Sequence, residues 1–428
     1  MNTNIFLLTK EKITFICATF IIILGQISIF FDSSAVLIIA LTVSVLVAIK
    51  IDQNEFVPFM LLLIAPNRSL TFGSISAPTI IMLIGVLRSL NGVTLKISKN
   101  FFIYILVFLG YCVATIGIGE SQVLSAFKIV VVLLFIWIYW SRDEIEKLYV
   151  KYVKCCSFGC IISTVIALFF NPSFLSESTR FSISDNGGEN VLGIICGVMA
   201  LHLLCIFLTE KGQEKGSAVM AVFLIAIGLI TGSRSFLMVL GIGVFSIITI
   251  SFFKLNIKRL GKILILMVFV AGIGILILST NDFLSEYMDQ LVYRINKLAT
   301  QDISNGRYEI WKQYLALFKQ NNIYFWFGNM DLTENGVIYV AHNMLLEQIA
   351  SIGIIGSFII SALYISTYLH IIRKSKSYII WFSEKIVPFI GFIIVSFVSH
   401  TLLGVPQTIM LYICGMAVLK SKKRRTTK

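Results

Sequence analysis

Long apolar runs recur along almost the whole of this chain, and they limit its possible folds more than any other feature. The runs begin near residue 13 and continue to residue 420, with short polar segments between them. The chain is 57% hydrophobic and only 13% charged, whereas a soluble domain carries about 25% charged residues. No polar stretch is long enough to fold as a separate water-soluble domain. We therefore expect one membrane domain over residues 1–428.

Most of these runs have the length of a membrane-spanning helix, which needs about 20 predominantly apolar residues. The clear candidates are approximately 13–31, 34–49, 101–119, 125–140, 153–170, 190–208, 217–231, 235–253, 261–279, 343–370, 386–402 and 405–420. Segments 55–65 and 76–90 are shorter, and Pro58, Pro66 and Pro78 interrupt or bound them. They form either two spans or one re-entrant pair. The pattern predicts an all-α polytopic membrane protein with 12 to 14 transmembrane helices.

The basic residues indicate how the chain is oriented in the membrane. The formal net charge of +13 would suggest a nucleic-acid partner in a soluble protein, but here the basic residues fall in short clusters between apolar runs, so we expect none. If the N-terminus is cytoplasmic, most of the 35 lysines and arginines lie in inside segments, which predicts a multi-pass protein with both termini cytoplasmic. The external exceptions are Arg68, Arg180, Arg234, Arg294, Lys297, Arg307, Lys312 and Lys319, with Lys128 inside a span.

This orientation places two loops outside the cell membrane, a smaller one over 171–189 and a large one over 280–341. Long loops with little structure of their own are usually functional. Within the large loop, residues 306–320 have the periodicity of an amphipathic helix. Its apolar face would consist of Ile310, Tyr314, Leu317 and Phe318. Such a helix would lie along the membrane surface or pack over the outer mouth of the bundle.

Several external side chains have chemistry suited to a charged, sugar-containing ligand. Arg234, in the short turn 231–235 (TGSRS), suits bidentate phosphate binding, although it could equally reach lipid headgroups. Arg307 has Trp311 one turn later, which suits a ligand with both phosphate and sugar, although tryptophan is also common at membrane interfaces. His342 could be a general base, a hydrogen-bond donor or a structural residue.

A longer pattern begins at His342. The sequence His342-Asn343, nine residues, Gly353, two residues and Gly356 resembles the signature of bacterial O-antigen ligases. Their relatives include Wzy-type polymerases of O-antigen and capsule, and oligosaccharyltransferases that modify pilin. The resemblance runs from about Arg180 to Gly356. It is also carried by Arg180 with 185–190, by the turn 231–234, and by Gly306-Arg307 with Trp311.

One stretch of the large loop departs from the family pattern. Members usually have a proline shortly before a Gly-x-Gly within the loop. In this chain the segment 322–329 (NIYFWFGN) has one glycine, Gly328, and no proline.

The resemblance implies a glycosyltransferase of the bacterial cytoplasmic (inner) membrane that uses a lipid-diphosphate-linked glycan. Members transfer glycans from undecaprenyl diphosphate to a sugar hydroxyl at the outer leaflet. The protein must then stabilise the departing diphosphate and activate the acceptor. The implied roles are diphosphate binding by Arg234, Arg307 and Arg180, catalysis by His342 or by Glu309 if the loop helix turns it inward, and sugar binding by Trp311 and Asn343. The external segments contain no acidic cluster with metal-ligand spacing, so we expect no metal or other cofactor.

Within this family we expect a polymerase that joins lipid-linked repeat units into O-antigen or capsular polysaccharide, because nothing identifies a lipid A core acceptor. Its expected partners are undecaprenyl-diphosphate-linked oligosaccharide, membrane lipids, a chain-length regulator and a flippase. The alternatives are an O-antigen ligase and, from a different class, a transporter or flippase of lipid-linked glycan. Transporters keep ionisable residues near the middle of the bilayer. Here the main charge within a span is Lys128, near the outer end of the span, and there is no internal repeat, which favours an enzyme.

Overall fold

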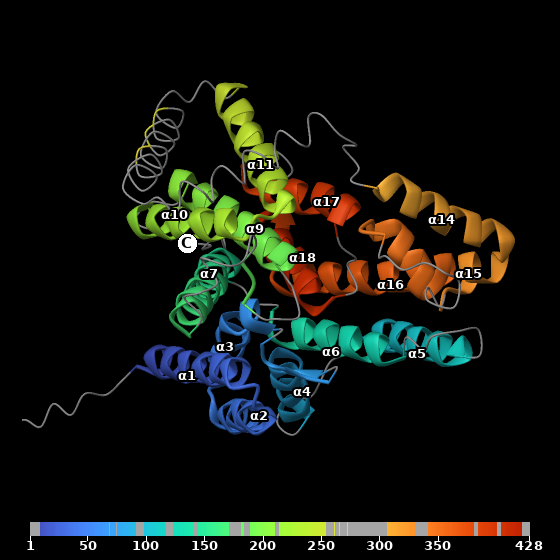
Figure 1. Ribbon diagram of the computed structural model, residues 1–428, viewed down its shortest axis with the longest axis horizontal. Coiled ribbons are helices and arrows are strands. Elements are labelled where there is room, and N and C mark those ends of the chain that lie inside the picture. Colours follow the sequence, from blue (N-terminus) through green and yellow to red (C-terminus); the bar gives the residue numbers. More distant parts are fainter. Residues whose placement is uncertain are drawn as a thin grey trace, which may run out of the picture.

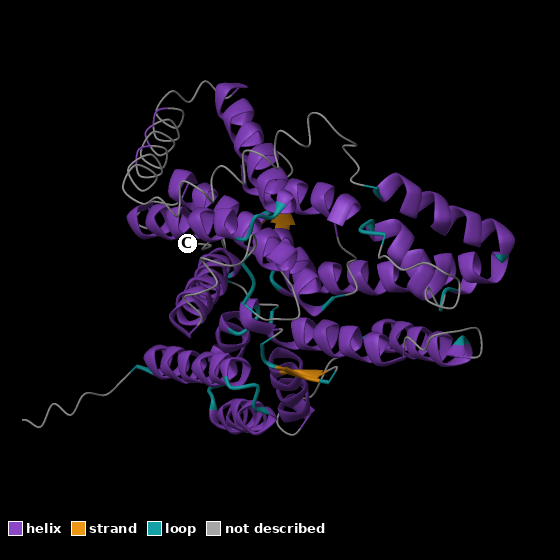
Figure 2. Cartoon of the chain, in the orientation of Figure 1, coloured by secondary structure: helices purple, strands orange, loops and turns teal. Residues whose placement is uncertain are grey.

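The computed structural model is built almost entirely of helices (Figures 1 and 2). Apart from isolated positions at 261, 265 and 272, the structure describes residues 9–67, 69–73, 75–90, 98–116, 123–140, 144–170, 181–183, 189–209, 214–253, 306–329, 341–380, 384–399 and 404–421. The expected span 261–279 therefore lies largely outside the described residues, as do Arg180 and most of the expected loops 171–189 and 280–341.

Five described helices are long and apolar enough to cross a membrane, and several shorter apolar helices of 10–17 residues accompany them. The long helices are α1 (Lys10–Phe30), α7 (Ile145–Phe170), α9 (Glu189–Thr209), α11 (Arg234–Phe253) and α16 (Met344–Lys374). The others are α2 (Ser34–Lys50), α3 (Phe56–Leu62), α4 (Ala77–Leu90), α5 (Lys99–Ala114), α6 (Val123–Tyr139), α10 (Glu214–Ile230), α14 (Arg307–Gln320), α15 (Asn322–Phe327), α17 (Val387–Ser399) and α18 (Val405–Ala417). The chain is an all-α polytopic membrane protein, as the apolar runs predicted.

Several serine and threonine hydroxyls inside the helices donate to a carbonyl one turn back in the same helix. Ser44 donates to the carbonyl of Ala40 over 2.8 Å, and Ser157 donates to that of Val153 over 2.8 Å. A hydroxyl bonded one turn back exposes no unpaired polar group to lipid, so serine and threonine are tolerated in apolar helices.

Helix α9 forms the centre of the bundle. In its apolar window 89% of the residues are buried, against 28–44% for the other four long helices, so most of its surface contacts protein and not lipid. It packs against α7, α10, α11, α17 and α18. Its buried His202 lies 2.9 Å from the hydroxyl of Tyr149 on α7 and 3.4 Å from the sulfur of Cys414 on α18.

The proline-bounded segments 55–65 and 76–90 form two unequal helices, α3 and α4. Helix α3 has seven residues, all buried, and at 1.5 Å per residue it is about 10 Å long, too short to cross a bilayer core of about 30 Å. The segment therefore enters the bundle without crossing it as a helix. The remaining short elements are 3-10 helices η1 (Gln53–Glu55), η2 (Ala65–Asn67) and η4 (Glu384–Ile386), and the antiparallel pairs β1 (Thr71–Phe72) with β2 (Ile75–Ser76) and β3 (Ser377–Ile379) with β4 (Leu419–Ser421).

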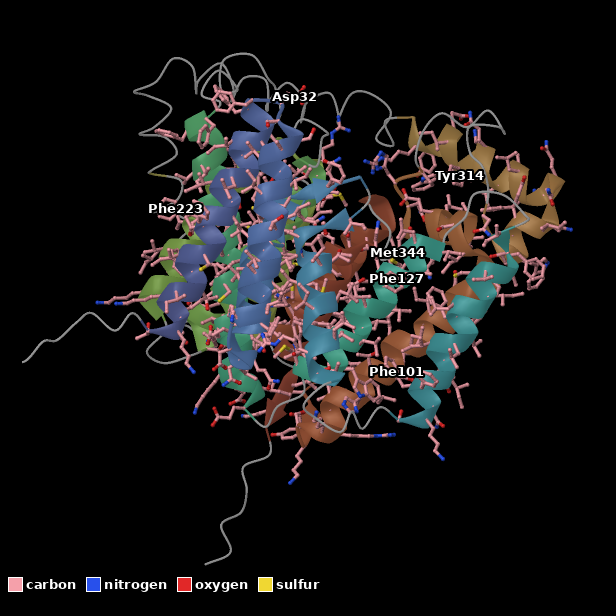
Figure 3. All side chains as sticks on the ribbon, turned by 90° about the horizontal axis from the view of Figure 1, so that it is seen from below. Asp32, Phe101, Phe127, Phe223, Tyr314 and Met344 are labelled. Atoms are coloured by element: carbon pink, nitrogen blue, oxygen red, sulfur yellow. The ribbon has the colours of Figure 1, made fainter. Side chains whose placement is uncertain are left out.

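The helices from the large loop lie at one end of the molecule. Figure 3 shows Tyr314 of α14 toward the same end as Asp32, which lies in the turn between α1 and α2, while Phe101, near the start of α5, lies toward the other end. Helices α14 and α15 pack beside α16 (Figure 1). The candidate site is therefore built at the end where α1 finishes and α2 begins.

Candidate functional site

One wall of the site is formed by α14 against the start of α16. Gly306 precedes α14 with a φ of 79°, and Tyr314 and Phe318 are then buried against Ala341 and Ala350. The partly buried residues packed around them include Ile310, Trp311, Leu317, Leu346 and Ile349. The predicted amphipathic helix and its apolar face are thus confirmed, and of the two expected placements the helix packs onto the bundle.

Trp311 anchors this wall beside the histidine of the signature. Its indole Nε1 donates a hydrogen bond of 2.8 Å to the carbonyl oxygen of Ala341, the residue before His342. The ring of Tyr308 meets it edge-on with centroids 5.5 Å apart, and Tyr308 itself is 60% exposed. The N–H of Trp311 is therefore used in holding α14 in place, while an aromatic surface beside it stays accessible.

The His342-Asn343 pair starts α16 by a specific backbone geometry. His342 has a φ of 48°, in the left-handed region, and is half-buried. The side-chain oxygen of Asn343 accepts from the backbone N–H groups of Leu345 (3.0 Å) and Leu346 (3.2 Å). Asparagine is among the preferred N-cap residues because its oxygen satisfies amides that lack a partner in the first helical turn. Asn343, expected to bind sugar, thus also has a structural role.

Replacing Asn343 tests the capping role. We expect Asn343→Ala to cost about 1 kcal/mol of stability through loss of the cap, whereas Asn343→Asp keeps the capping oxygen and the stability of the wild type. Thermal unfolding of the purified protein measures both effects. If Asn343→Asp unfolds as readily as Asn343→Ala, the side-chain oxygen does not act as the cap.

The two glycines of the signature are required for different structural reasons. The first is Gly353. It interrupts α16 with φ 63° and ψ 176°, a conformation essentially restricted to glycine. A Cβ there would overlap the carbonyl oxygen of Trp326 and lie 2.6 Å from the nitrogen of Gly328. Gly328 also has a positive φ, of 75°, and its own Cβ would overlap the nitrogen of Gly353. We call this close backbone contact between Gly328 and Gly353 the glycine crossing.

The second signature glycine, Gly356, leaves space for Tyr111 of α5. A Cβ on Gly356 would lie 2.7 Å from the Tyr111 ring. The hydroxyl of Tyr111 lies 2.8 Å from the carbonyl oxygen of Ile352 and 3.0 Å from that of Phe327. Ile352 precedes Gly353 and Phe327 precedes Gly328, so Tyr111 contacts both segments of the glycine crossing. Sequence reasoning missed Tyr111 because it lies far from the signature and no local pattern marks it.

Asn329 completes this junction. Its backbone N–H donates to the carbonyl of Ser351 over 2.9 Å, and its side-chain nitrogen donates to the carbonyl of Thr115 over 2.5 Å. The departure from the family pattern noted at 322–329 therefore falls on a segment that contacts both α16 and the end of α5.

Glu347, in the first turn of α16, is a second residue that sequence reasoning did not single out. Its Oε1 atom is buried from solvent. Burial and, second to it, the Glu347 carboxylate together raise the pKa of Tyr314 to about 12, which places the two groups near each other. Tyr314 is therefore neutral at physiological pH. The sequence signal that could have identified Glu347 was the position of its carboxylate, one helical turn after Asn343.

The turn before α11, which carries Arg234, lies beside the start of α9. Gly232 has a φ of 58°, and the hydroxyl of Ser233 accepts from the backbone N–H of Phe236 over 3.3 Å. The same hydroxyl donates to the side-chain oxygen of Asn190 on α9 over 3.3 Å. Arg234 follows as the half-buried first residue of α11. The turn is thus fixed to α9, and this contact determines the position of the Arg234 backbone.

The other residues expected at the site are Arg307, Glu309 and Arg180. Arg307 is the half-buried first residue of α14. The Glu309 side chain is 72% exposed and pairs with Lys312 over 2.7 Å, so the inward carboxylate required for a catalytic role of Glu309 is not seen in this conformation. Arg180 lies outside the described residues.

The wall of α14 and α16 brings together Trp311, His342 and Asn343, with Arg307 on the same helix as Trp311. A histidine, an arginine and an aromatic surface can respectively exchange a proton, bind an anionic oxygen and stack on a sugar face. Within the described part of the chain no group of three or more His, Cys, Asp or Glu side chains could hold a metal ion.

Comparison with known proteins agrees with this picture. Residues 219–361 match the family described as O-antigen ligase. No curated protein and no solved structure matches the chain. The matching segment contains the turn before α11, all of α14 and the start of α16. This chain is an all-α polytopic membrane protein whose residues 219–361 match the family described as O-antigen ligase.

Proposed function

We propose that the protein is a polysaccharide polymerase that joins undecaprenyl-diphosphate-linked repeat units at the outer leaflet of the bacterial cytoplasmic membrane. The observation that carries the proposal is the O-antigen ligase match over residues 219–361, which includes His342, Arg307 and Arg234. The charge bias of the loops supports an orientation with both termini in the cytoplasm. In that orientation α14 and the start of α16 face outward.

In the proposed reaction the acceptor hydroxyl attacks the sugar carbon that bears the diphosphate. The bond to the lipid diphosphate breaks, and the diphosphate leaves with the electron pair. Arg307 and Arg234, with Arg180, neutralise the developing charge through charge-assisted hydrogen bonds. His342 accepts the hydroxyl proton, because an imidazole can exchange protons near neutral pH and so suits general base catalysis. Trp311, with Asn343, orients the sugar.

The proposal prefers a polymerase over a ligase because no feature of the sequence identifies a lipid A core acceptor. In a polymerase the acceptor is a second lipid-linked repeat unit. A ligase would use the same donor-side residues and differ only in the acceptor. The two therefore have to be separated by their products.

A deletion strain tests the proposal directly. We expect its surface polysaccharide to shorten to one repeat unit, because repeats are still exported and attached but no longer joined. The lipopolysaccharide or capsule profile on a gel measures this, and expression of the wild-type chain should restore the long form. Long chains that never become attached to core would assign a ligase instead. Lipid-linked repeats trapped on the inner leaflet would assign a flippase.

A further inference from the structure

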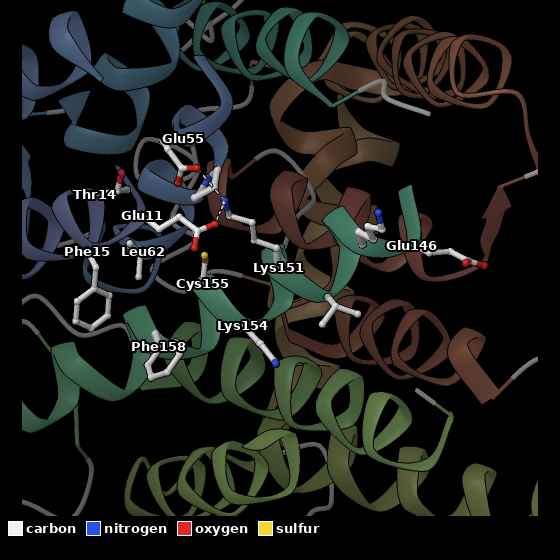
Figure 4. Close-up of a pocket in the computed structure, with 13 residues that line it drawn as sticks. Glu11, Thr14, Phe15, Glu55, Leu62, Glu146, Lys151, Lys154, Cys155 and Phe158 are labelled. Carbon is white, nitrogen blue, oxygen red and sulfur yellow. Dashed lines mark hydrogen bonds and ion pairs between the residues drawn. The ribbon is translucent and has the colours of Figure 1, made fainter. Parts of the chain in front are cut away.

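A cavity lies at the end of the bundle where α1 and α7 begin. Its volume is about 630 Å³, and it is formed by the first turns of α1, by η1 and α3, and by α7 (Figure 4). Helix α1 runs from this cavity to its last turn, next to Asp32, at the end that carries α14 (Figure 3). The cavity is therefore separate from the candidate site already described.

The charged residues that line the cavity are balanced. They comprise three acidic and three basic side chains, Glu11, Glu55, Glu146, Lys147, Lys151 and Lys154. Lys151 lies 2.9 Å from both Glu11 and Glu55, and Glu55 is only 8% exposed, so this ion triad fixes α1 and η1 against α7. Glu11 remains 69% exposed although it takes part in the triad. Its carboxylate thus has room for a second cationic partner.

The opposite part of the cavity is apolar. Phe15 of α1 and Phe158 of α7 meet edge-on with ring centroids 5.8 Å apart, and they are 38% and 40% exposed. Lys151 and Phe158 are seven residues apart on one helix, which corresponds to about 10 Å along its axis. The cavity thus leads from a charged end into the apolar belt of the bundle. This is the profile of a phospholipid, whose headgroup and acyl chain are adjacent.

We propose that this cavity binds a zwitterionic phospholipid of the phosphatidylethanolamine type. Figure 4 shows Glu11 and Lys154 on opposite sides of Cys155, with Phe15 and Phe158 together at one edge. The lipid ammonium group binds Glu11, the phosphate binds Lys154, and an acyl chain leaves over the two phenylalanine rings. The balanced charge selects a zwitterion, because an anionic headgroup would meet as many carboxylates as ammonium groups. This inference does not rest on the proposed glycosyltransferase activity.

Native mass spectrometry of the purified full chain tests the site with two defined probes, dioleoyl phosphatidylethanolamine and dioleoyl phosphatidylglycerol. We expect the wild type to retain the ethanolamine lipid at least about fivefold more strongly than the glycerol lipid, the effect of one charge-assisted hydrogen bond. Equal retention of the two lipids, or preference for the anionic one, would overturn the proposal. This arm uses the wild type and needs no substitution.

Variants place the lipid in the cavity. Lys154→Ala and Glu11→Gln should each lower retention of the ethanolamine lipid about fivefold, and Lys154→Arg should keep it. The matched control is Lys12→Ala, which removes an exposed lysine beside Glu11 that does not line the cavity. Unchanged lipid retention in both Lys154→Ala and Glu11→Gln would show that the lipid binds elsewhere, and the proposed site would be wrong.

Discussion

Replacing Gly353 with alanine is expected to abolish polymer formation and to lower the unfolding temperature of the protein. Gly353 holds φ 63° and ψ 176°, and a residue with a side chain in that region costs on the order of 1–3 kcal/mol. The added methyl group would also lie 2.6 Å from the nitrogen of Gly328 and overlap the carbonyl oxygen of Trp326. Because both neighbours are backbone atoms, they cannot move aside as a flexible side chain would. The segment around Gly328 must therefore separate from α16.

The measurement combines a polysaccharide gel from complemented cells with thermal unfolding of the purified protein. We expect a fall in Tm of about 1–3 °C from the strain alone, given the length of the chain, and a larger fall once the backbone overlap is added. Gly241→Ala is the matched control, because Gly241 lies inside α11 and its added Cβ would meet nothing within 4 Å. That control should leave polymer unchanged and add about 0.5–1 kcal/mol of helix stability. A Gly353→Ala protein that melts and polymerises like the wild type would contradict the glycine crossing.

Replacing His342 with alanine is expected to abolish polymer formation while the protein still accumulates in the membrane. His342 is half-buried and directly follows Ala341, a member of the cluster that holds α14 on α16. Loss of a general base typically lowers the rate about 10²–10⁴-fold. The readouts are polymer on a gel and the amount of protein in washed membranes.

The backbone at His342 requires a second variant. Its φ of 48° lies in the left-handed region, which costs alanine about 1–2 kcal/mol. His342→Gly removes the imidazole without that strain, and His342→Asn keeps a side chain that tolerates the conformation. If all three variants lose polymer at normal protein levels, the imidazole itself is needed. Wild-type polymer from His342→Gly would remove the histidine from the mechanism. Gln313→Ala, at an exposed position of α14, is the neutral control.

The sequence predicted those parts of the structure that local patterns determine. Apolar runs and their length predicted the helices, and a period of 3.6 residues predicted α14 together with its buried face. Tyr314 and Phe318 are the buried residues of that face, as expected. These features depend on residues within one helix, so a single segment of sequence is enough to predict them.

The rest depends on contacts between distant segments. The partners of the signature glycines, Gly328 on one side and Tyr111 on the other, lie far from Gly353 in sequence, and no spacing rule connects them. The orientation of Glu309 was also open, because either side of a helical turn can face inward. In the structure Lys312, three residues later, pairs with the carboxylate at the surface. The proposed diphosphate and sugar roles remain predictions.

The contact of Tyr111 with the glycine crossing has a consequence for engineering. Residues 219–361 match the O-antigen ligase family, yet the backbone geometry around Gly353 is held partly by a tyrosine hydroxyl from α5, outside that segment. The matching segment is therefore not a structurally independent unit that can be exchanged between relatives. A chimera that exchanges residues 219–361 would therefore need α5 to be exchanged with the 322–329 segment, so that Tyr111 keeps its contacts with Phe327 and Ile352.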